Sequence, residues 1–250
     1  MGFKGGNILE PSCVTGNFLG NLPDSLNNSK IYGIELDSIS GKIAKYLYPN
    51  FNIQIKGFEE TKFSNNLFDV AVGNVPFGEF KLNDQAYNKN NFFIHDYFFA
   101  KSIDKIRTGG IIAFITSNGT LDKKDDSIRR YIGSRCDLLG AIRLPNDTFK
   151  GVAGTEVTSD IIFLQKKNSI VDIEQDWYKL DTDENGLTYN KYFIDNPDMI
   201  IGDMSEISGR FGNKLACISK NNTELSTELN KAIKNIKGTY QEVEIEESEN

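Results

Sequence analysis

The chain has 250 residues, of which 39% are hydrophobic and 25% are charged, and its formal net charge at pH 7 is −7. This length suffices for one well-buried α/β domain with an appendage, and the absence of a long apolar run or a signal-like amino terminus excludes a membrane protein, so we expect a cytoplasmic one. Cys13, Cys136 and Cys217 are widely separated and lack metal-ligand spacing, so we expect reduced thiols and no metal site.

Apolar, β-branched segments alternate with segments of helical periodicity along the chain. This alternation predicts an α/β fold whose mostly parallel sheet is covered by helices on both faces. We expect strands at residues 7–10, 31–35, 52–56, 68–73, 110–116, 137–143 and 160–166. We expect helices at residues 17–26, 38–48, 92–107, 124–134 and 223–237.

The first predicted strand ends in a carboxylate, Glu10, and continues into a turn of small residues before a predicted helix. Strand, tight turn and helix amino terminus form the cradle that α/β folds use for nucleotides, although such turns also serve plain helix–strand packing. The second strand ends in Glu35, about 20 residues after the turn, where an acid can grip a ribose diol. We therefore assign the ribose to Glu35, with Asp37 as the second choice.

The fourth predicted strand leads into the tetrapeptide Asn74-Val75-Pro76-Phe77 and a glycine turn. The exocyclic amine of a planar base has two hydrogens, and the Asn74 side-chain oxygen and the Val75 carbonyl, fixed by Pro76, could accept both. Phe77 could stack on the face of the ring. An ordinary strand exit stopped by proline is the alternative, but cradle, spaced acid and tetrapeptide together favour chemistry on adenine.

Several segments, in their order along the chain, resemble the motifs of N6-adenine DNA methyltransferases that use S-adenosylmethionine, with the cofactor motif first, as in the gamma arrangement. The whole run is similar to the methylase module of large methylase–helicase fusion proteins of plasmids, phages and conjugative elements. The likeness covers residues 5–167. Its segments are Ile8–Phe18, Gly33–Asp37, Asn74–Phe77, His95–Phe99, Gly109–Thr116 and Gly154–Leu164.

This resemblance implies a Rossmann-like S-adenosylmethionine-dependent methyltransferase fold, with a seven-stranded sheet whose final strand is antiparallel. It implies methyl transfer to N6 of an adenine that is flipped from duplex DNA or lies in a single strand. Residues 1–170 would form the catalytic domain, and residues 171–250 an acidic appendage with a helix near 223–237. The chain would be an adenine-specific DNA methyltransferase or a fragment of a larger protein with that activity.

The resemblance also implies roles for single residues. The catalytic residues would be Asn74, Val75, Pro76 and Phe77. Residues 91–99 would form the helix that flanks the methionine end of the cofactor, and Glu59 would approach its adenine. The cofactor-binding residues would be Glu10, Pro11, Ser12, Cys13, Thr15, Gly16, Phe18, Glu35, Glu59 and Asn74.

Two departures from the family pattern favour an alternative, a catalytically impaired binding module. Val14 stands where relatives usually have glycine, and if its φ is positive the β-branched side chain costs about 1–3 kcal/mol. The helix that would close over the methionine moiety also has no counterpart, because the chain begins at Met1. A methyltransferase that acts on small molecules or proteins stays open as well, since the fold is shared.

Charge is unevenly distributed: residues 1–170 carry 20 Lys and Arg against 18 Asp and Glu, whereas residues 171–250 carry 8 against 17. An acidic tail is not what a duplex-binding surface uses, so we expect an additional domain or subunit to recognise the target sequence. Basic residues gather after the fifth strand, where phosphate contact and a solvated helix face are both open. They are Lys123, Lys124, Arg129, Arg130, Arg135, Arg143 and Lys150.

Overall fold

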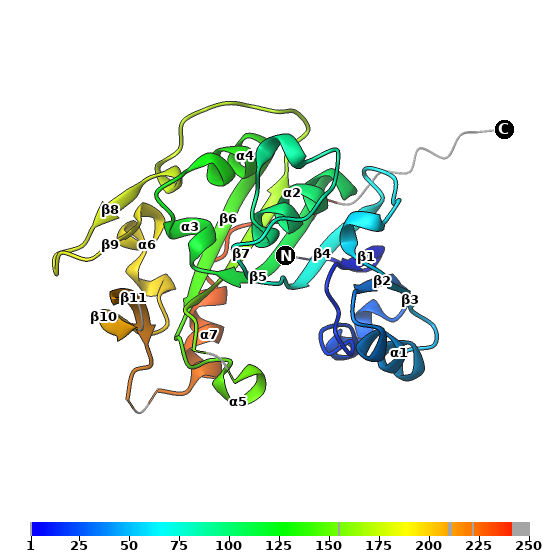
Figure 1. The fold of residues 1–250 in the computed structure, drawn as a ribbon, viewed down its shortest axis with the longest axis horizontal. Helices are drawn as coiled ribbons and strands as arrows, with labels where there is room; N and C mark the ends of the chain where they lie inside the picture. Colours follow the sequence, from blue (N-terminus) through cyan, green and yellow to red (C-terminus); the bar gives the residue numbers. More distant parts are fainter. Residues whose placement is uncertain (1, 155, 210–211, 222, 242–250) are drawn as a thin grey trace.

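A seven-stranded sheet forms the centre of the molecule in the computed structural model, which describes residues 2–154, 156–209, 212–221 and 223–241 (Figure 1). Its strand order is β3-β2-β1-β4-β5-β7-β6. The strands are β1 Asn7–Glu10, β2 Lys30–Glu35, β3 Asn52–Ile55, β4 Phe68–Asn74, β5 Ile106–Ser117, β6 Cys136–Leu144 and β7 Ser159–Lys166. All seven predicted strands are confirmed, with small differences at their ends.

Strand direction sets the edge of the sheet at which a ligand can bind. The neighbours from β3 to β5 pair in parallel, whereas β7 lies antiparallel between β5 and β6. From β1 the chain proceeds through β2 to β3 on one side and then returns to place β4 on the other side. The carboxyl ends of β1 and β4 therefore flank the crevice where open α/β sheets bind ligands.

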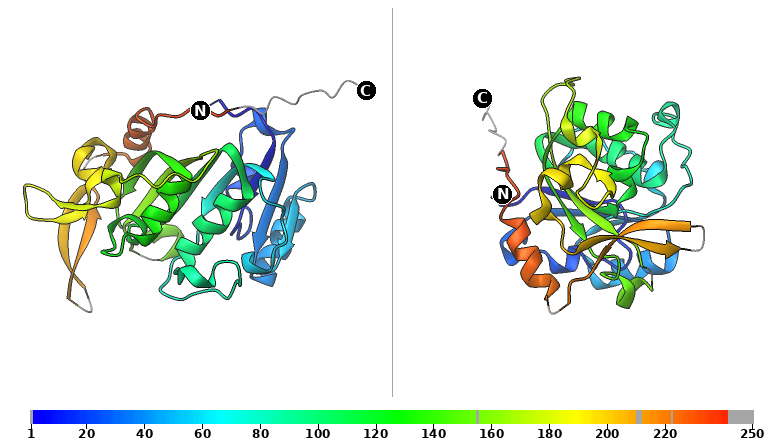
Figure 2. Two further views of the ribbon diagram at one scale, coloured as in Figure 1. Left: turned by 90° about the horizontal axis from the view of Figure 1, so that it is seen from above. Right: turned by 90° about the vertical axis from the view of Figure 1, so that its left-hand side faces the viewer.

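Helices cover both faces of this sheet, as predicted. Helices α2 Ile94–Lys105 and α4 Ser127–Arg135 lie on one face, and α1 Ser38–Leu47 and α7 Leu225–Ile233 lie on the other (Figures 1 and 2). The α1 helix turns its small residues Gly41 and Ala44 toward the sheet. A Cβ at Gly41 would lie 2.8 Å from Ile55 Cγ1, so glycine permits this close approach. The short helices α3 Gly119–Asp122 and α5 Lys150–Ala153 follow β5 and β6.

The predicted helix at residues 17–26 is wrong. That segment contains two 3-10 helices, Leu19–Asn21 and Asp24–Leu26. Pro23 has no backbone N–H to donate, and Gly20 has low helix propensity. The turn also packs tightly on Tyr48, since a Cβ at Gly20 would lie 2.0 Å from the Tyr48 hydroxyl. An irregular turn therefore replaces the expected α-helix.

The segment after β7 builds small hairpins at the β6 side of the sheet, in a region where the sequence predicted no strand and, before residue 223, no helix. The strands β8 Leu180–Thr182 and β9 Thr188–Asn190 form one antiparallel pair, and β10 Asp203–Gly209 and β11 Gly212–Ile218 form another. Between the two pairs lies α6 Lys191–Asp195. Among the described residues, no helix is both long and apolar enough to cross a membrane.

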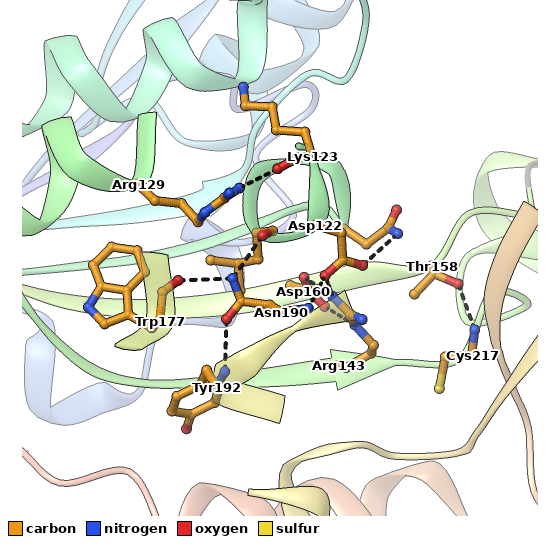
Figure 3. Close-up of polar contacts among 12 residues, drawn as sticks. Asp122, Lys123, Arg129, Arg143, Thr158, Asp160, Trp177, Asn190, Tyr192 and Cys217 are labelled. Carbon is orange, nitrogen blue, oxygen red and sulfur yellow. Dashed lines mark hydrogen bonds and ion pairs between the residues drawn. The ribbon is translucent and has the colours of Figure 1, made fainter. Parts of the chain in front are cut away.

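Buried polar contacts fix the β8–β9 hairpin to α3, the short helix that follows β5 (Figure 3). The fully buried Asn190 side chain donates hydrogen bonds to the carbonyls of Leu121 at 2.8 Å and Trp177 at 2.9 Å. Its backbone N–H donates to Asp122 Oδ1 at 3.0 Å. Because unpaired buried carbonyls are costly, Asn190 ties α3, the segment before β8 and the end of β9 into one packed unit.

The basic cluster is not a continuous charged surface. Arg143 is fully buried and pairs with Asp160, Nε to Oδ1, at 2.8 Å and with Asp122, Nη2 to Oδ1, at 2.9 Å. Arg129 is also buried and donates to the carbonyls of Tyr178 and Lys123. These two guanidinium groups satisfy interior acceptors and are unavailable to phosphates.

Candidate active site

The carboxyl ends of β1, β2 and β4 bring the three predicted parts of the site to one edge of the sheet. β1 lies between β2 and β4 in the sheet, with Glu10 level with Gly33 and Leu9 level with Ala71. The turn after β1, the acid that ends β2 and the tetrapeptide after β4 are consequently neighbours.

Glu35 faces the turn that follows β1. Its Oε2 accepts a hydrogen bond from the Val14 backbone N–H at 2.8 Å, and its Oε1 accepts one from the Asp37 N–H at 2.7 Å. Asp37, the second choice for the ribose, caps α1 by accepting from the Ser40 N–H at 2.8 Å. That hydrogen bond lowers the pKa of Asp37. The two acids thus have separate structural tasks, and Glu35 is the one held at the turn.

The turn itself is compact and strained. Val14 has a φ of +49° and Gly16 a φ of +88°, both in the left-handed region that β-branched residues disfavour. Gly16 donates its N–H to the Cys13 carbonyl at 2.6 Å, and a Cβ at Gly16 would lie 2.5 Å from Tyr48 Cε2. The Val14 side chain is 52% exposed, so it points outward instead of into the core.

The remaining residues of the turn differ in exposure. Pro11 and Cys13 are buried, Ser12 and Thr15 are half-buried, and Phe18 is exposed. The Thr15 hydroxyl donates to Asn17 Oδ1 at 3.4 Å. The outer rim of the turn is therefore accessible, whereas its base is packed.

Glu10 is a buried acid between the turn and the tetrapeptide. Burial raises its pKa to about 8, against a smaller lowering by a backbone hydrogen bond from Leu19 and with a further increase from Glu35. Among the described residues, Glu10 Oε2 has no hydrogen-bond partner. A Cβ at Gly73 would lie 3.2 Å from Glu10 Cγ, which places this acid beside the residue that precedes Asn74. An orphaned acceptor here fits a cationic ligand group.

The tetrapeptide begins at the last residue of β4. The Asn74 side chain is exposed, and no hydrogen bond occupies it within the described part of the chain. Val75 anchors the segment, because its side chain is buried and its N–H donates to the Ile115 carbonyl at 3.0 Å. Pro76 and Phe77 are half-buried. This arrangement leaves the Asn74 amide free to meet a ligand while the backbone beneath it is fixed.

Glu59 lies in the 3-10 helix Phe58–Glu60, which follows β3. The exit of β3 is joined to β2 by a hydrogen bond from the Lys56 N–H to the Glu35 carbonyl at 2.9 Å. The Glu59 carbonyl accepts a hydrogen bond from Lys101 Nζ of α2 at 3.1 Å. Glu59 is half-buried and sits on the same edge of the sheet as Glu35.

The first turn of α2 contains a buried acid that the sequence reasoning missed. Asp96 forms an ion pair with Lys123, and His95 Nε2 lies 3.5 Å from Asp96 Oδ1. Burial lowers the pKa of His95, which favours the neutral imidazole. The sequence did offer a signal for Asp96, which stands within the aromatic run Phe92–Phe99. Such a run is expected to be buried, and a buried carboxylate needs a cationic partner.

Leu36 is a second residue that the sequence reasoning missed. It follows Glu35 directly, and its apolar side chain is 73% exposed. This exposed leucine lies beside the fixed carboxylate of Glu35. If Glu35 binds the ribose of a nucleoside, Leu36 offers an apolar surface on which the attached base can pack. The sequence signal for Leu36 was its position directly after Glu35, the predicted ribose ligand.

The sequence of this chain matches a known family over nearly its whole length. A sequence model described as N-6 DNA Methylase matches residues 3–247. The chain is 33% identical over 174 residues to Defense against restriction protein B of Escherichia phage P1, a match that covers 64% of this chain and 7% of that protein. It is 28% identical over 116 residues to Modification methylase CviBIII of Paramecium bursaria Chlorella virus NC1A, a match that covers 44% of this chain and 30% of that protein. The chain thus spans less than a third of either relative.

Solved structures share the fold. A class I S-adenosylmethionine-dependent methyltransferase, described as putative, from Listeria monocytogenes has a TM-score of 0.55 and 20% identity, covering 70% of this chain and 57% of that one. A second structure is described as a modification subunit of a putative type I restriction enzyme from Vibrio vulnificus YJ016. It has a TM-score of 0.54 and 18% identity, and the match covers 88% of this chain and 56% of that one. At these identities the likeness shows the methyltransferase fold.

Proposed function

The chain belongs to the N-6 DNA methylase family, and on that basis we propose that it transfers a methyl group from S-adenosylmethionine to N6 of adenine in DNA. The observation that carries this proposal is the position of Asn74 at the carboxyl end of β4, on the same edge of the sheet as Glu10 at the end of β1 and Glu35 at the end of β2. A base held by Asn74 and a cofactor held by Glu35 would share one crevice.

We assign the cofactor to the turn after β1 and its neighbours. S-adenosylmethionine supplies an electrophilic methyl group on a sulfonium when bound. Glu35 would accept hydrogen bonds from the ribose hydroxyls, Leu36 would pack on the adenine ring and Glu59 would approach its edge. The unpartnered Glu10 Oε2 fits the positively charged methionine end, since an approaching cation favours the ionised carboxylate. The turn residues named above would line the remainder of the cofactor.

The tetrapeptide would supply the chemistry on the base. The lone pair of adenine N6 is drawn into the ring, which makes the neutral amine a weak nucleophile. Acceptors at Asn74 Oδ1 and the Val75 carbonyl would bind its two hydrogens and return electron density as N6 attacks the methyl carbon in line. Pro76 fixes the backbone and Phe77 stacks on the ring. The S–CH3 bond would break as the N–CH3 bond forms, leaving S-adenosylhomocysteine as a neutral thioether. The excess proton of the methylated amine would pass to water, so this mechanism needs no strong base.

We further propose that residues 1–170 form the catalytic unit and that residues 171–250 are an appendage. Target recognition would come from another domain or subunit. The relative from phage P1 is far longer than the segment matched here, which agrees with such a division of labour.

One observation bears on a second candidate, a binding module with impaired catalysis, which the comparisons do not favour. Val14 adopts a φ of +49° where the family pattern has glycine, so the cofactor turn carries backbone strain. Isothermal titration calorimetry with S-adenosylmethionine separates the two candidates. Binding together with N6-methyladenine in nuclease digests of treated DNA supports the enzyme. Absence of the methylated product at millimolar cofactor, with or without cofactor binding, supports the impaired module.

A further inference from the structure

A cavity of about 330 Å³ lies between α2 and the segment that joins β4 to α2. This segment, residues 78–93, begins directly after Phe77, and we call it the β4–α2 loop. Small-molecule sites commonly have volumes of this order. The cavity is lined by Lys81, Leu82, Asn83, Tyr87, Asn88, Asn91, Phe92 and Tyr97.

The floor of the cavity is aromatic. Tyr87, Phe92 and Tyr97 are all buried, and the rings of Tyr87 and Tyr97 meet edge to face with centroids 5.4 Å apart. Both tyrosine hydroxyls are engaged: Tyr97 donates to Asp84 Oδ2 at 2.7 Å, and Tyr87 donates to Asp104 Oδ2 at 2.6 Å. Because their hydroxyls are occupied, these residues offer the cavity ring surface.

The rim of the cavity is polar and carries one cation. Lys81 Nζ donates to Asn91 Oδ1 at 2.5 Å, and the Asp84 N–H donates to Asn88 Oδ1 at 3.0 Å. Asn88 Nδ2 in turn donates to Asn83 Oδ1 at 2.8 Å. A lysine and a backbone N–H can only donate, so these contacts fix which end of each amide is oxygen. All three amide oxygens are occupied within the loop.

The groups left for a ligand are therefore donors. Within the described part of the chain, Nδ2 of Asn83 and Nδ2 of Asn91 have no protein acceptor, and the Lys81 ammonium is exposed at the mouth. No acidic side chain lines the cavity. Such a rim suits a planar group with carbonyl acceptors at its edge and a negative charge close by.

The loop is held in this shape without a ligand. Lys101 of α2 is buried and forms an ion pair with Asp84 at 3.0 Å. The Phe80 carbonyl accepts the Ile94 N–H at 2.9 Å, which joins the two ends of the loop at the start of α2. A cavity held open by such contacts spares the entropy cost of ordering the loop upon binding.

We propose that this cavity binds a second nucleotide of the DNA strand that carries the target adenine, and that it prefers bases with ring carbonyls, namely guanine, thymine or cytosine. This preference at a single base would add to the recognition of the longer target sequence, which we assign to another domain or subunit. The aromatic floor would contact the base, the free amide groups of Asn83 and Asn91 would donate to its carbonyl oxygens, and Lys81 would contact a phosphate. This proposal rests on the proposed function, since the nucleotide would belong to the strand whose adenine meets the tetrapeptide.

The direct test is nuclear magnetic resonance of the uniformly 15N-labelled chain with short single-stranded oligonucleotides that contain one adenine. The side-chain amide signals of Asn83 and Asn91 report on the cavity, and that of Asn74 reports on the target site. In a set of oligonucleotides, an abasic site replaces each neighbour of the adenine in turn. We expect one abasic position to abolish the Asn83 and Asn91 shifts while the Asn74 shift persists.

Variants supply the affinity readout. We expect Asn91→Ala and Lys81→Ala to weaken oligonucleotide binding roughly fivefold to tenfold in fluorescence anisotropy, as loss of a base or phosphate contact does. Matched substitutions elsewhere, Asn185→Ala in the β8–β9 turn and Lys45→Ala on α1, should leave binding within about twofold. Replacing the neighbouring base by adenine should also weaken binding in the parent chain but not in Asn91→Ala.

The outcomes separate this proposal from the proposed function. Shifts at Asn74 with unmoved Asn83 and Asn91 signals would overturn the second site and leave adenine binding intact. Shifts at Asn83 and Asn91 without methylation by the chain would support the second site while the catalytic proposal fails. Unmoved signals at all three amides, or equal loss of binding in the control variants, would overturn the nucleotide site.

Discussion

The Glu35 carboxylate holds the Val14 backbone, with Oε2 2.8 Å from the Val14 nitrogen. This contact ties the end of β2 to the turn after β1 and keeps Val14 at a φ of +49°. The acid that we assign to the ribose therefore also fixes the shape of the cradle. Substitution of either residue should therefore change the affinity for the cofactor.

Val14→Gly should stabilise the chain and tighten cofactor binding. Removal of the β-branched side chain relieves about 1–3 kcal/mol of backbone strain, and the added freedom of the unfolded chain offsets about 0.5–1 kcal/mol. Urea unfolding should show a net gain of about 1 kcal/mol, and calorimetry should show higher affinity for S-adenosylmethionine. Val14→Ala keeps a Cβ and serves as the control with a smaller gain. A less stable glycine variant would contradict the strain at this position.

Glu35→Gln should weaken S-adenosylmethionine binding at least tenfold, because the carboxylate accepts charge-assisted hydrogen bonds that an amide replaces poorly. Asp37→Ala is the matched control, since Asp37 caps α1. It should cost about 1 kcal/mol of folding stability and leave cofactor affinity nearly unchanged. Calorimetry and urea unfolding of both variants give the comparison. Equal loss of affinity in the two would argue against Glu35 as the ribose ligand.

Glu10 should make the chain less stable as pH rises. Its pKa is about 8 in the fold against 4.5 in the unfolded chain, so the unfolded state releases its proton first. The contribution of the neutral acid to the free energy of unfolding is complete below pH 4.5, declines from there to about pH 8 and then levels off. The total loss of stability over this range is of the order of 5 kcal/mol. Urea unfolding across this range should show the slope, and Glu10→Gln should remove it. Parallel curves for the two proteins would refute this assignment.

Asn190→Ala should destabilise the fold by about 2–4 kcal/mol. The substitution leaves the buried carbonyls of Leu121 and Trp177 without their donor. Asn185 lies exposed in the β8–β9 turn, so Asn185→Ala should change stability by less than about 0.5 kcal/mol. Chemical denaturation followed by Trp177 fluorescence compares them. If Asn190→Ala leaves stability unchanged, the β8–β9 hairpin is not fixed through this contact.

The sheet could be predicted from the sequence because each strand is a short apolar run ending at glycine, proline or a polar residue. The motif spacing also located Glu10, Glu35 and Asn74, because parallel strands bring their carboxyl ends together. These assignments remain proposals as functional roles.

Long-range packing explains what the sequence did not reveal. The segment at 17–26 was expected to be helical, but Tyr48, distant in sequence, packs against Gly16 and Gly20 and imposes an irregular turn. Arg143 reads as a surface charge until Asp160 and Asp122 are seen around it in the interior. Neither contact has a local periodicity that could signal it.

Methyl transfer by Asn74→Ala tests the central claim most directly. The parent chain and the variant are incubated with S-adenosylmethionine labelled in the methyl group and with DNA, and digested nucleosides are separated. We expect labelled N6-methyladenine from the parent, at least a thousandfold less from Asn74→Ala, and cofactor affinities within about threefold of each other, because Asn74 acts on the base. Methylation of adenine by the variant at the parent's rate would contradict the role of the tetrapeptide.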